Sequence, residues 1–292
     1  MMIPSQERTV TSARHVAWVV LLGPACFHPS YDHPTCGPAG ECPDGLTCNA
    51  QRICEGAGGS IDAAIRPPDA AIDGFPGFPA PSICDTADPN VIACYRFDSD
   101  TKDSSTNHLD ATMTNVSFPA GQVGQAMLFG ATSAADVNDS PLFDVTALTI
   151  EAWIKPMQLP SSGNKAFILD VDRQYSLFLE FDGSLTCTLV SGTALPPTTA
   201  HLTMGQWTHV ACTYDGATAA IYVNGVASAT ATDTSGGTLG RFGNTGMSIA
   251  ADNNPTGPDR SWLIGSVDEL RLMKIARTAA QICNDAGKSS CP

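Results

Sequence analysis

The sequence predicts an all-β domain, a two-sheet antiparallel sandwich over residues 83–292, preceded by a small disulfide-stapled module. Short runs rich in β-branched and aromatic residues recur at 149–155, 175–180, 185–190, 207–214 and 219–223. Between them stand Asp182-Gly183, Asp215-Gly216 and Asn224-Gly225, dipeptides that favour hairpin turns. No helical period separates the runs, which is typical of an antiparallel sandwich or barrel.

The first 25 residues read as a signal peptide. Arg8 and Arg14 precede an apolar run from Val16 to Leu22, and small residues follow it. A membrane span needs about 20 apolar residues, so this run suits export instead. Cys26 comes directly after it, as in a bacterial lipobox, where the cysteine carries the lipid. We expect an exported chain, either secreted or held peripherally at the cell surface by a lipid on Cys26; a free or intermolecularly paired Cys26 is the alternative.

Residues 26–55 form a cysteine-rich module. Cys36, Cys42, Cys48 and Cys54 recur every six residues with almost no apolar material between them. Such a piece cannot build a core, so we expect two disulfides, although sequence leaves their pairing open. A zinc site would show cysteines two to four residues apart, and none are. Residues 56–82, rich in Gly and Pro, follow as a linker.

Turn lengths predict which residues share a face. A two-residue turn at Asp215-Gly216 places His209 opposite Tyr222, on the face away from Cys212. A two-residue turn at Asp182-Gly183 would mix polar and apolar residues on one face, because a slip of one residue swaps the buried set. A three-residue loop, 181–183, with Gly183 left-handed removes that conflict.

Cysteine positions in the sandwich predict further disulfides. If strand 185–190 pairs with strand 207–214, Cys187 lies beside Cys212 on the core side, and their bond would stabilise the domain by roughly 3 kcal/mol. Two buried thiols are the alternative. Cys84, Cys94, Cys283 and Cys291 lie near the domain's two ends. Local pairs, 84 with 94 and 283 with 291, are simplest, and a bond joining the ends stays open.

Seven short motifs occur in an order that resembles a known family. They begin at Ala93-Cys-Tyr-Arg-Phe-Asp98, Asp103-Ser-Ser-Thr-Asn107 and Gly124-Gln-Ala-Met-Leu-Phe-Gly130, and continue through Leu148–Pro156, Gly205–Gly216, Ile221–Gly225 and Ile264–Leu272. Together they resemble the laminin-G-like jelly-roll group of the concanavalin A-like lectin/glucanase fold, over residues 91–282. The resemblance implies a two-sheet antiparallel jelly-roll sandwich with a concave face and a role in binding or adhesion. Thr106 and His108 replace glycines of the family's loop.

The same fold hosts glycoside hydrolases, so catalysis must be weighed. A retaining glycosidase needs two carboxyl groups about 5–5.5 Å apart. Strand 149–155 holds only Glu151, and neither the pair Asp170 and Asp172 nor Glu180 reproduces the enzymes' arrangement. There is no Gly-x-Ser-x-Gly elbow either. We therefore expect a protein that is not an enzyme.

The resemblance also implies one structural calcium ion. Asp98, Asp103, Asn107 and Asp268 match family positions that could supply its oxygen ligands. The alternative is turn capping, in which Asp and Asn bond their own backbone.

A glycan is the third possibility. Trp207, His209 and Tyr222 are predicted on one face away from the core, where aromatic and polar side chains suit sugar stacking. The alternative is a covered second core layer; Trp153 and Trp262 are expected in the core. With 29 acidic against 15 basic residues and a net charge of −14, binding to nucleic acid is excluded. We expect an exported, non-catalytic surface binding or adhesion protein whose partner is a glycan or a cell-surface protein. A carbohydrate-binding module is the runner-up, followed by a glycosidase.

Overall fold

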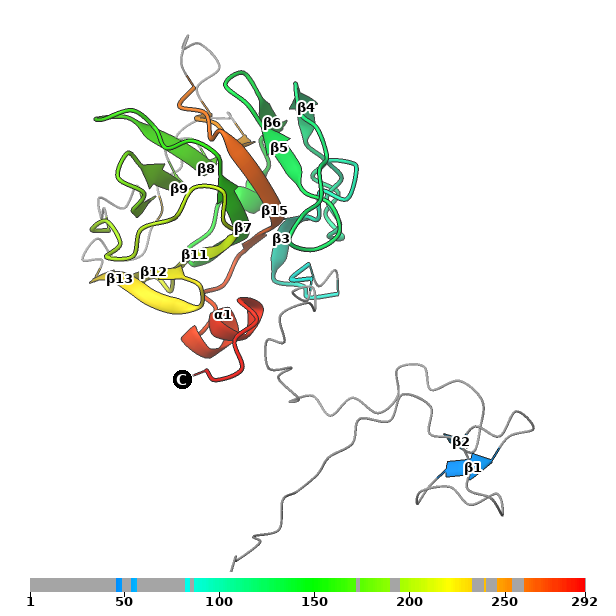
Figure 1. Ribbon diagram of the computed structural model, residues 1–292. Helices are drawn as coiled ribbons and strands as arrows, with labels where there is room; N and C mark the ends of the chain where they lie inside the picture. The colour runs from blue at the N-terminus through cyan, green and yellow to red at the C-terminus, as the bar shows by residue number, and fades with distance from the viewer. Residues whose placement is uncertain are drawn as a thin grey trace, which may run out of the picture. The chain divides into compact units, whose positions relative to one another are not determined.

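The computed structural model describes residues 46–48, 54–56, 82–84, 87–171, 174–189, 195–232, 239, 246–253 and 260–291 (Figure 1). The chain divides into two compact units, Met1–Pro68 and Asp69–Pro292. The signal segment, Cys26, Cys36, Cys42 and linker residues 57–81 lie outside the described residues, so what was expected of them stays a prediction. No helix in the described part of the chain is both long and apolar enough to cross a membrane.

The described residues of the N-terminal unit form a short hairpin. Strands β1 (Leu46–Cys48) and β2 (Cys54–Gly56) pair antiparallel, with Cys48 directly opposite Cys54. The disulfide pairing of this module lies outside the described features and stays a prediction.

The second unit consists mainly of two antiparallel sheets, as the sequence predicts. The six-stranded sheet has the order β10 (Leu185–Leu189), β9 (Tyr175–Glu180), β8 (Lys165–Val171), β14 (Met247–Ile249), β6 (Ala134–Val137) and β4 (Thr112–Thr114). The seven-stranded sheet has the order β13 (Val226–Thr232), β12 (Thr218–Val223), β11 (Thr208–Tyr214), β7 (Leu148–Pro156), β15 (Gly265–Met273) and β3 (Val91–Tyr95), with β5 (Met127–Phe129) also paired to β15. A 3-10 turn, η1 (Pro141–Phe143), and a C-terminal helix, α1 (Ala279–Asp285), complete the elements.

The core lies between the two sheets. Because side chains alternate along a strand, Ile150, Ala152 and Ile154 of β7 point inward and are fully buried, as does Val210 of β11. The intervening residues of β7 point to the outer face, yet Glu151 and Trp153 are buried as well. The outer face of the seven-stranded sheet is therefore covered by further parts of the chain.

The three-residue loop at 181–183 is confirmed. Glu180 N donates to Ser184 O (2.8 Å), Leu179 stands opposite Leu185, and Gly183 has φ +88°. Glycine adopts this left-handed conformation without the steric cost that a Cβ would bring.

The turn predicted at Asp215-Gly216 lies one residue further along the chain, so the predicted strand register is wrong by two positions. Asp215 N donates to Thr218 O (3.1 Å), so Gly216 and Ala217 form the turn, and Tyr214 pairs with Ala219. Ala211 rather than His209 therefore stands opposite Tyr222. The Asp215 carboxylate favours this turn, because it accepts hydrogen bonds from the backbone of Ala217 (2.8 Å) and Thr218 (2.6 Å). A shift of two residues preserves which face each side chain occupies.

The disulfide Cys187–Cys212 is present, but the strand pairing used to predict it is wrong. Cys187 lies on β10 in the six-stranded sheet, whereas Cys212 lies on β11 in the seven-stranded sheet. The bond, with its Cα atoms 6.4 Å apart, therefore joins the two sheets through the core. Both cysteines point inward in either arrangement, which is why the pair could be predicted without the topology.

The remaining described disulfides are the local ones, Cys84–Cys94 and Cys283–Cys291. The sequence reading did not anticipate helix α1. It begins at Thr278, whose hydroxyl accepts a hydrogen bond from Gln281 N while the Gln281 side chain accepts one from Thr278 N, a capping box. This helix packs against the sheet face on which Tyr222 was predicted to bind a ligand.

Candidate functional site

The predicted aromatic platform is mostly buried. Trp207, His209 and Tyr222 do share the outer face of the seven-stranded sheet, but His209 is fully buried and Tyr222 only 7% exposed. Trp207 alone is half-buried, with the Lys155 ammonium 5.9 Å from its ring centre. The structure therefore matches the covered-layer alternative for His209 and Tyr222.

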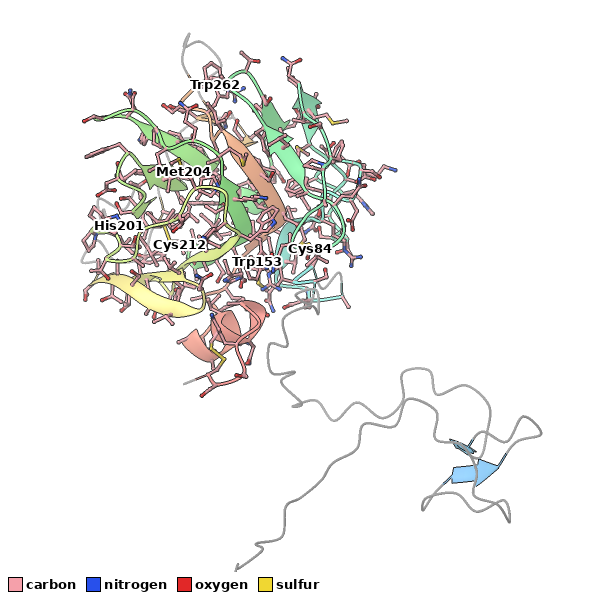
Figure 2. All side chains as sticks on the ribbon, in the orientation of Figure 1. Cys84, Trp153, His201, Met204, Cys212 and Trp262 are labelled. Carbon is pink, nitrogen blue, oxygen red and sulfur yellow. A yellow bond between two sulfur atoms is a disulfide. The ribbon has the colours of Figure 1, made fainter. Side chains whose placement is uncertain are left out.

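Helix α1 covers this platform. Its Ile282 packs in one apolar cluster with Ala211, Ala220 and Tyr222 of the sheet. In Figure 1 the helix lies directly beside β11, β12 and β13. Trp153, edge-on to His209 with ring centres 5.1 Å apart, adds to the same layer. Trp153 is buried as expected, whereas Trp262 is only half-buried (Figure 2).

A buried charge network fills the rest of this face. Glu151 Oε2 accepts a hydrogen bond from Arg271 Nη2 (2.5 Å), and Glu151 Oε1 lies 3.1 Å from His209 Nε2. Arg271 also bonds to Asp285 of α1 (2.6 Å). Burial would raise the pKa of Glu151, but His209 and Arg271 outweigh it and hold that pKa well below its usual range. The fully buried Glu151 carboxylate therefore joins β7 to β11 through His209 and to β15 through Arg271.

The residues predicted to bind calcium separate into two groups. Asp103 is fully engaged with the backbone, because its Oδ1 accepts from Cys94 N (2.9 Å) and Ser105 N (2.8 Å) and its Oδ2 from the Ser105 hydroxyl (2.7 Å). Asn107 donates from Nδ2 to Ile92 O (2.9 Å). These two side chains brace the loop after β3, as turn capping predicts.

Asp98 and Asp268 meet at a different turn. Asp98 Oδ1 accepts from Gln125 N (2.8 Å), and Asp268 Oδ2 accepts from the backbone of Gln122 and Val123 (both 2.8 Å). The other oxygen of Asp268 is buried without a partner, and burial raises the pKa of Asp268 to about 7. Among the described residues, no group of three or more His, Cys, Asp or Glu side chains could hold a metal ion. The four predicted ligands therefore do not form one set. Asp98 and Asp268 both bind the turn at residues 121–125, and the calcium prediction now rests on these two carboxylates.

The outer face of the six-stranded sheet carries a feature that the sequence reading did not identify. One row of polar side chains crosses all six strands, each residue opposite the next. In strand order it consists of Thr188, Ser176, Asp170, Ser248, Asp136 and Thr112. We call this set the polar row. Its members lie on the face away from the apolar core.

The loop around Asn253 and Arg260 organises the polar row. Arg260 binds Asp136 through two hydrogen bonds (2.7 and 3.0 Å) and also donates to the Ser248 hydroxyl (2.8 Å). Asn253 N donates to Asp170 Oδ2 (2.8 Å). Partial burial would raise the pKa of Asp136, but hydrogen bonds from Arg260 and Ser248 lower it below its usual range.

The middle of the row is buried and its ends are open. Ser248 is fully buried and Ser176 is 4% exposed, whereas the Asp136 side chain is 44% exposed. Thr188 at the other end is half-buried, and Thr112 is exposed. Solvent, or a ligand with polar groups, can therefore reach the row from its two ends.

A cationic corner lies further along the same face. The Lys165 ammonium sits 4.5 Å from the ring centres of both Phe167 and Phe178, which pair across β8 and β9. Glu180 stands opposite Lys165 and accepts a hydrogen bond from the Thr186 hydroxyl (3.1 Å). This part of the face offers a cation, a carboxylate and a hydroxyl within a few residues of one another.

From the sequence, Asp170 and Glu180 of this face were considered only as carboxylates that do not form a glycosidase arrangement. Asp170 pairs with Ser248 of β14, a strand far away in the sequence, so only the sheet order brings these two side chains together.

Comparison with known proteins agrees with this architecture. The family model Laminin_G_3, described as the concanavalin A-like lectin/glucanases superfamily, matches residues 129–283. No curated protein matches the chain.

Solved structures share the fold at low identity. Domain 4 of AbnA, a GH43 extracellular arabinanase from Geobacillus stearothermophilus, in complex with arabinotriose, has 24% identity and a TM-score of 0.56, covering 68% of this chain and 98% of that one. The binding domain of Paraclostridial Mosquitocidal Protein 1 has 15% identity and a TM-score of 0.56, covering 68% and 52%. The binding domain of botulinum neurotoxin DC, in complex with SialylT, has 12% identity and a TM-score of 0.51, covering 70% and 52%.

The match thus spans nearly all of the arabinanase domain but only about half of each toxin binding domain. At these identities the likeness establishes the fold. The family model covers more than half of the sequence, and the two packed antiparallel sheets are those of its superfamily. The chain belongs to the Laminin_G_3 family of the concanavalin A-like lectin/glucanases superfamily.

Proposed function

We propose that this chain is an exported, non-catalytic binding protein whose sandwich domain recognises a glycan. The observation that carries the proposal is the polar row, with Arg260 and Asn253 bound to its carboxylates. Sugar hydroxyls both donate and accept hydrogen bonds, and pre-positioned carboxylates, amides and hydroxyls on a rigid sheet are suitable partners. Two of the similar structures are complexes, one with arabinotriose and one with SialylT, which supports a carbohydrate ligand here.

Binding without hydrolysis is supported by the state of the row's carboxylates. Asp170 and Asp136 stand two strands apart with Ser248 between them, about 10 Å at the usual strand spacing. Retaining glycosidases need their carboxyl groups about 5–5.5 Å apart, so this separation does not fit a retaining mechanism; inverting enzymes use about 6.5–9.5 Å. An acid catalyst also needs a raised pKa, whereas that of Asp136 is lowered. Both carboxylates serve better as fixed hydrogen-bond acceptors.

Export is supported by three disulfides among the described residues of the sandwich, since disulfides persist in oxidising compartments. The signal segment and Cys26 support the same location from sequence, with attachment through a lipid on Cys26 as the proposed anchor. Cys26→Ser should then shift the protein from the membrane fraction to the medium.

A glycan array probed with the full-length protein tests the proposal. We expect binding to at least one oligosaccharide class without release of reducing ends. Asp136→Asn should weaken that binding about tenfold, because an amide cannot keep both hydrogen bonds from Arg260. Trp207→Ala is the matched control on the other sheet. If Trp207→Ala abolishes binding and Asp136→Asn does not, the half-buried Trp207 edge is the ligand site and the polar row is not.

A further inference from the structure

The segment Ser82–Cys84 is held more firmly than its position at the end of a linker would suggest. Glu269 Oε2 accepts from the Ser82 hydroxyl (2.6 Å), Ile83 N (2.8 Å) and Cys84 N (3.1 Å). Ile83 and Cys84 are each only 3% exposed. We call Ser82–Cys84 the N-terminal latch.

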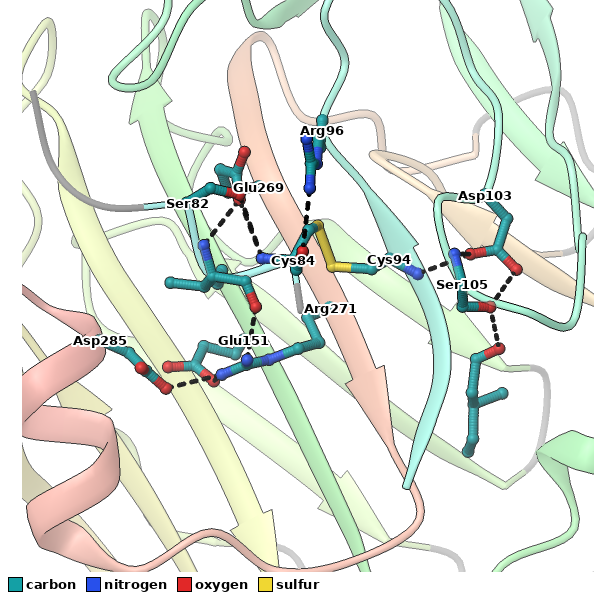
Figure 3. The surroundings of a disulfide bond; sticks show 12 residues. Ser82, Cys84, Cys94, Arg96, Asp103, Ser105, Glu151, Glu269, Arg271 and Asp285 are labelled. Carbon is teal, nitrogen blue, oxygen red and sulfur yellow. Dashed lines mark hydrogen bonds and ion pairs between the residues drawn. A yellow bond between two sulfur atoms is a disulfide. The ribbon is translucent and has the colours of Figure 1, made fainter. Parts of the chain in front are cut away.

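The carbonyl groups of the latch are bound as well. Arg271 donates from Nη1 to Ile83 O, and Arg96 donates from Nη2 to Cys84 O (3.1 Å). The disulfide Cys84–Cys94 then fixes the latch covalently to β3 (Figure 3). Both backbone amides and both carbonyls of residues 83 and 84 therefore have partners on the outer face of the seven-stranded sheet.

Arg271 also holds the opposite end of the sandwich domain. Its Nη2 donates to Asp285 of α1 (2.6 Å), which in turn accepts from Arg277 Nη2. Figure 3 shows the Arg271 guanidinium lying between Asp285, Glu151 and the latch. A guanidinium is a rigid planar fork, so a partner that orients one nitrogen also orients the other.

We propose that the N-terminal latch and helix α1 form one cooperative terminal lock, in which Arg271 couples the docking of one end of the sandwich domain to that of the other. Burial strengthens the coupling, because the Arg271 and Glu151 side chains are 4% and 0% exposed and any displacement of α1 would admit water to them. Energetic coupling between two sites is reciprocal, so loosening either end must loosen the other.

The lock and the proposed ligand site lie on different sheets. The latch is bound to Glu269 and Arg271 on the outer face of the seven-stranded sheet, whereas the polar row lies on the outer face of the six-stranded sheet. The terminal lock can therefore be tested without altering the polar row.

Hydrogen exchange of the full-length protein tests the coupling. The readout is exchange of the Ile83 and Cys84 amides, followed by mass spectrometry of quenched, reduced peptides. Asp285→Asn should speed their exchange by about tenfold, since hydrogen bonds between charged groups are among the stronger ones. Glu269→Gln, which changes the acceptor itself, is the positive control. Asp182→Asn, an equal charge change at an exposed loop with 45% side-chain exposure, should leave the latch unchanged.

If Asp285→Asn also speeds amide exchange in β11, the variant has destabilised the whole domain, and a reciprocal experiment is then needed to test the coupling. Replacing Cys84 and Cys94 together by Ser should speed exchange of the α1 amides Ile282 and Ala286, which bond to Thr278 O and Ile282 O. Faster exchange at the distant end in this variant, with β11 unchanged, supports the lock. Unchanged α1 exchange in the double Cys variant, or an unchanged latch in a folded Asp285→Asn protein, would overturn it.

Discussion

Tyr222→Ala tests whether the outer face of the seven-stranded sheet is a structural layer. Tyr222 is 7% exposed and packs with Ala211, Ala220 and Ile282 under α1. Emptying a buried aromatic site usually costs about 3–5 kcal/mol. Because a small part of this ring still reaches solvent, we expect about 3 kcal/mol.

The assay is chemical and thermal unfolding of the full-length protein. For a domain of this size, about 3 kcal/mol corresponds to a fall in the thermal midpoint of roughly 6–12 °C. Val226→Ala is the matched control on the adjacent strand, because Val226 is 66% exposed and should change stability by less than about 0.5 kcal/mol. Tyr222→Phe keeps the packing of the ring, so its change in stability measures the contribution of the hydroxyl alone.

A loss below about 0.5 kcal/mol for Tyr222→Ala would refute this reasoning. It would mean that α1 does not cover the face in solution and that Trp207, His209 and Tyr222 form an open platform. The ligand site would then belong on this sheet instead of on the polar row.

Three further predictions follow from the described contacts. Because His209 and Arg271 lower the pKa of Glu151 from about 4.5 to about 2, the ionised Glu151 carboxylate stabilises the folded protein above pH ~4.5. This contribution to the free energy of unfolding is lost as the pH falls from 4.5 to about 2, and Glu151→Gln should remove that part of the pH dependence. Replacing Cys187 and Cys212 together by Ser should cost roughly 3 kcal/mol in denaturant titrations, and an unaltered midpoint would argue against the inter-sheet bond. If a calcium ion binds at Asp98 and Asp268, EDTA should lower the thermal midpoint of the parent protein but not of Asp268→Asn; equal midpoints with and without EDTA in the parent would end the calcium prediction.

The alternation of apolar and polar residues was enough to predict which face of its sheet each side chain occupies, but not which strands pair with one another. Alternation along β11 and β12 predicted that Cys212 points inward and His209 outward. That assignment is correct although the predicted register was wrong by two residues, because a shift of two keeps each side chain on its face. The error arose because the Asp215 side chain binds two backbone amides, a local choice that the dipeptide Asp-Gly does not reveal. The Cys187–Cys212 bond was predictable for the same reason, while its passage between sheets was not.

The polar row could not have been predicted from the sequence. It joins six residues on strands that are consecutive in the sheet but scattered along the chain from Thr112 to Ser248. Each is an ordinary outward-facing polar residue when taken alone. Only the strand order β8–β14–β6 places Asp170, Ser248 and Asp136 side by side, with Arg260 across them.

The outer faces of the two sheets differ because both ends of the sandwich domain dock on the same sheet. The latch and α1 cover the outer face of the seven-stranded sheet and leave its Trp207 edge half-buried. On the six-stranded sheet the middle of the polar row is buried as well, but the Asp136 end is open, with the Asp136 side chain 44% exposed. The charge network of Glu151, Arg271 and Asp285 holds the covered face of the seven-stranded sheet in place. A binding-loss variant that maps to that network should therefore also lose stability, whereas one at the exposed Asp136 should lose affinity with little loss of stability.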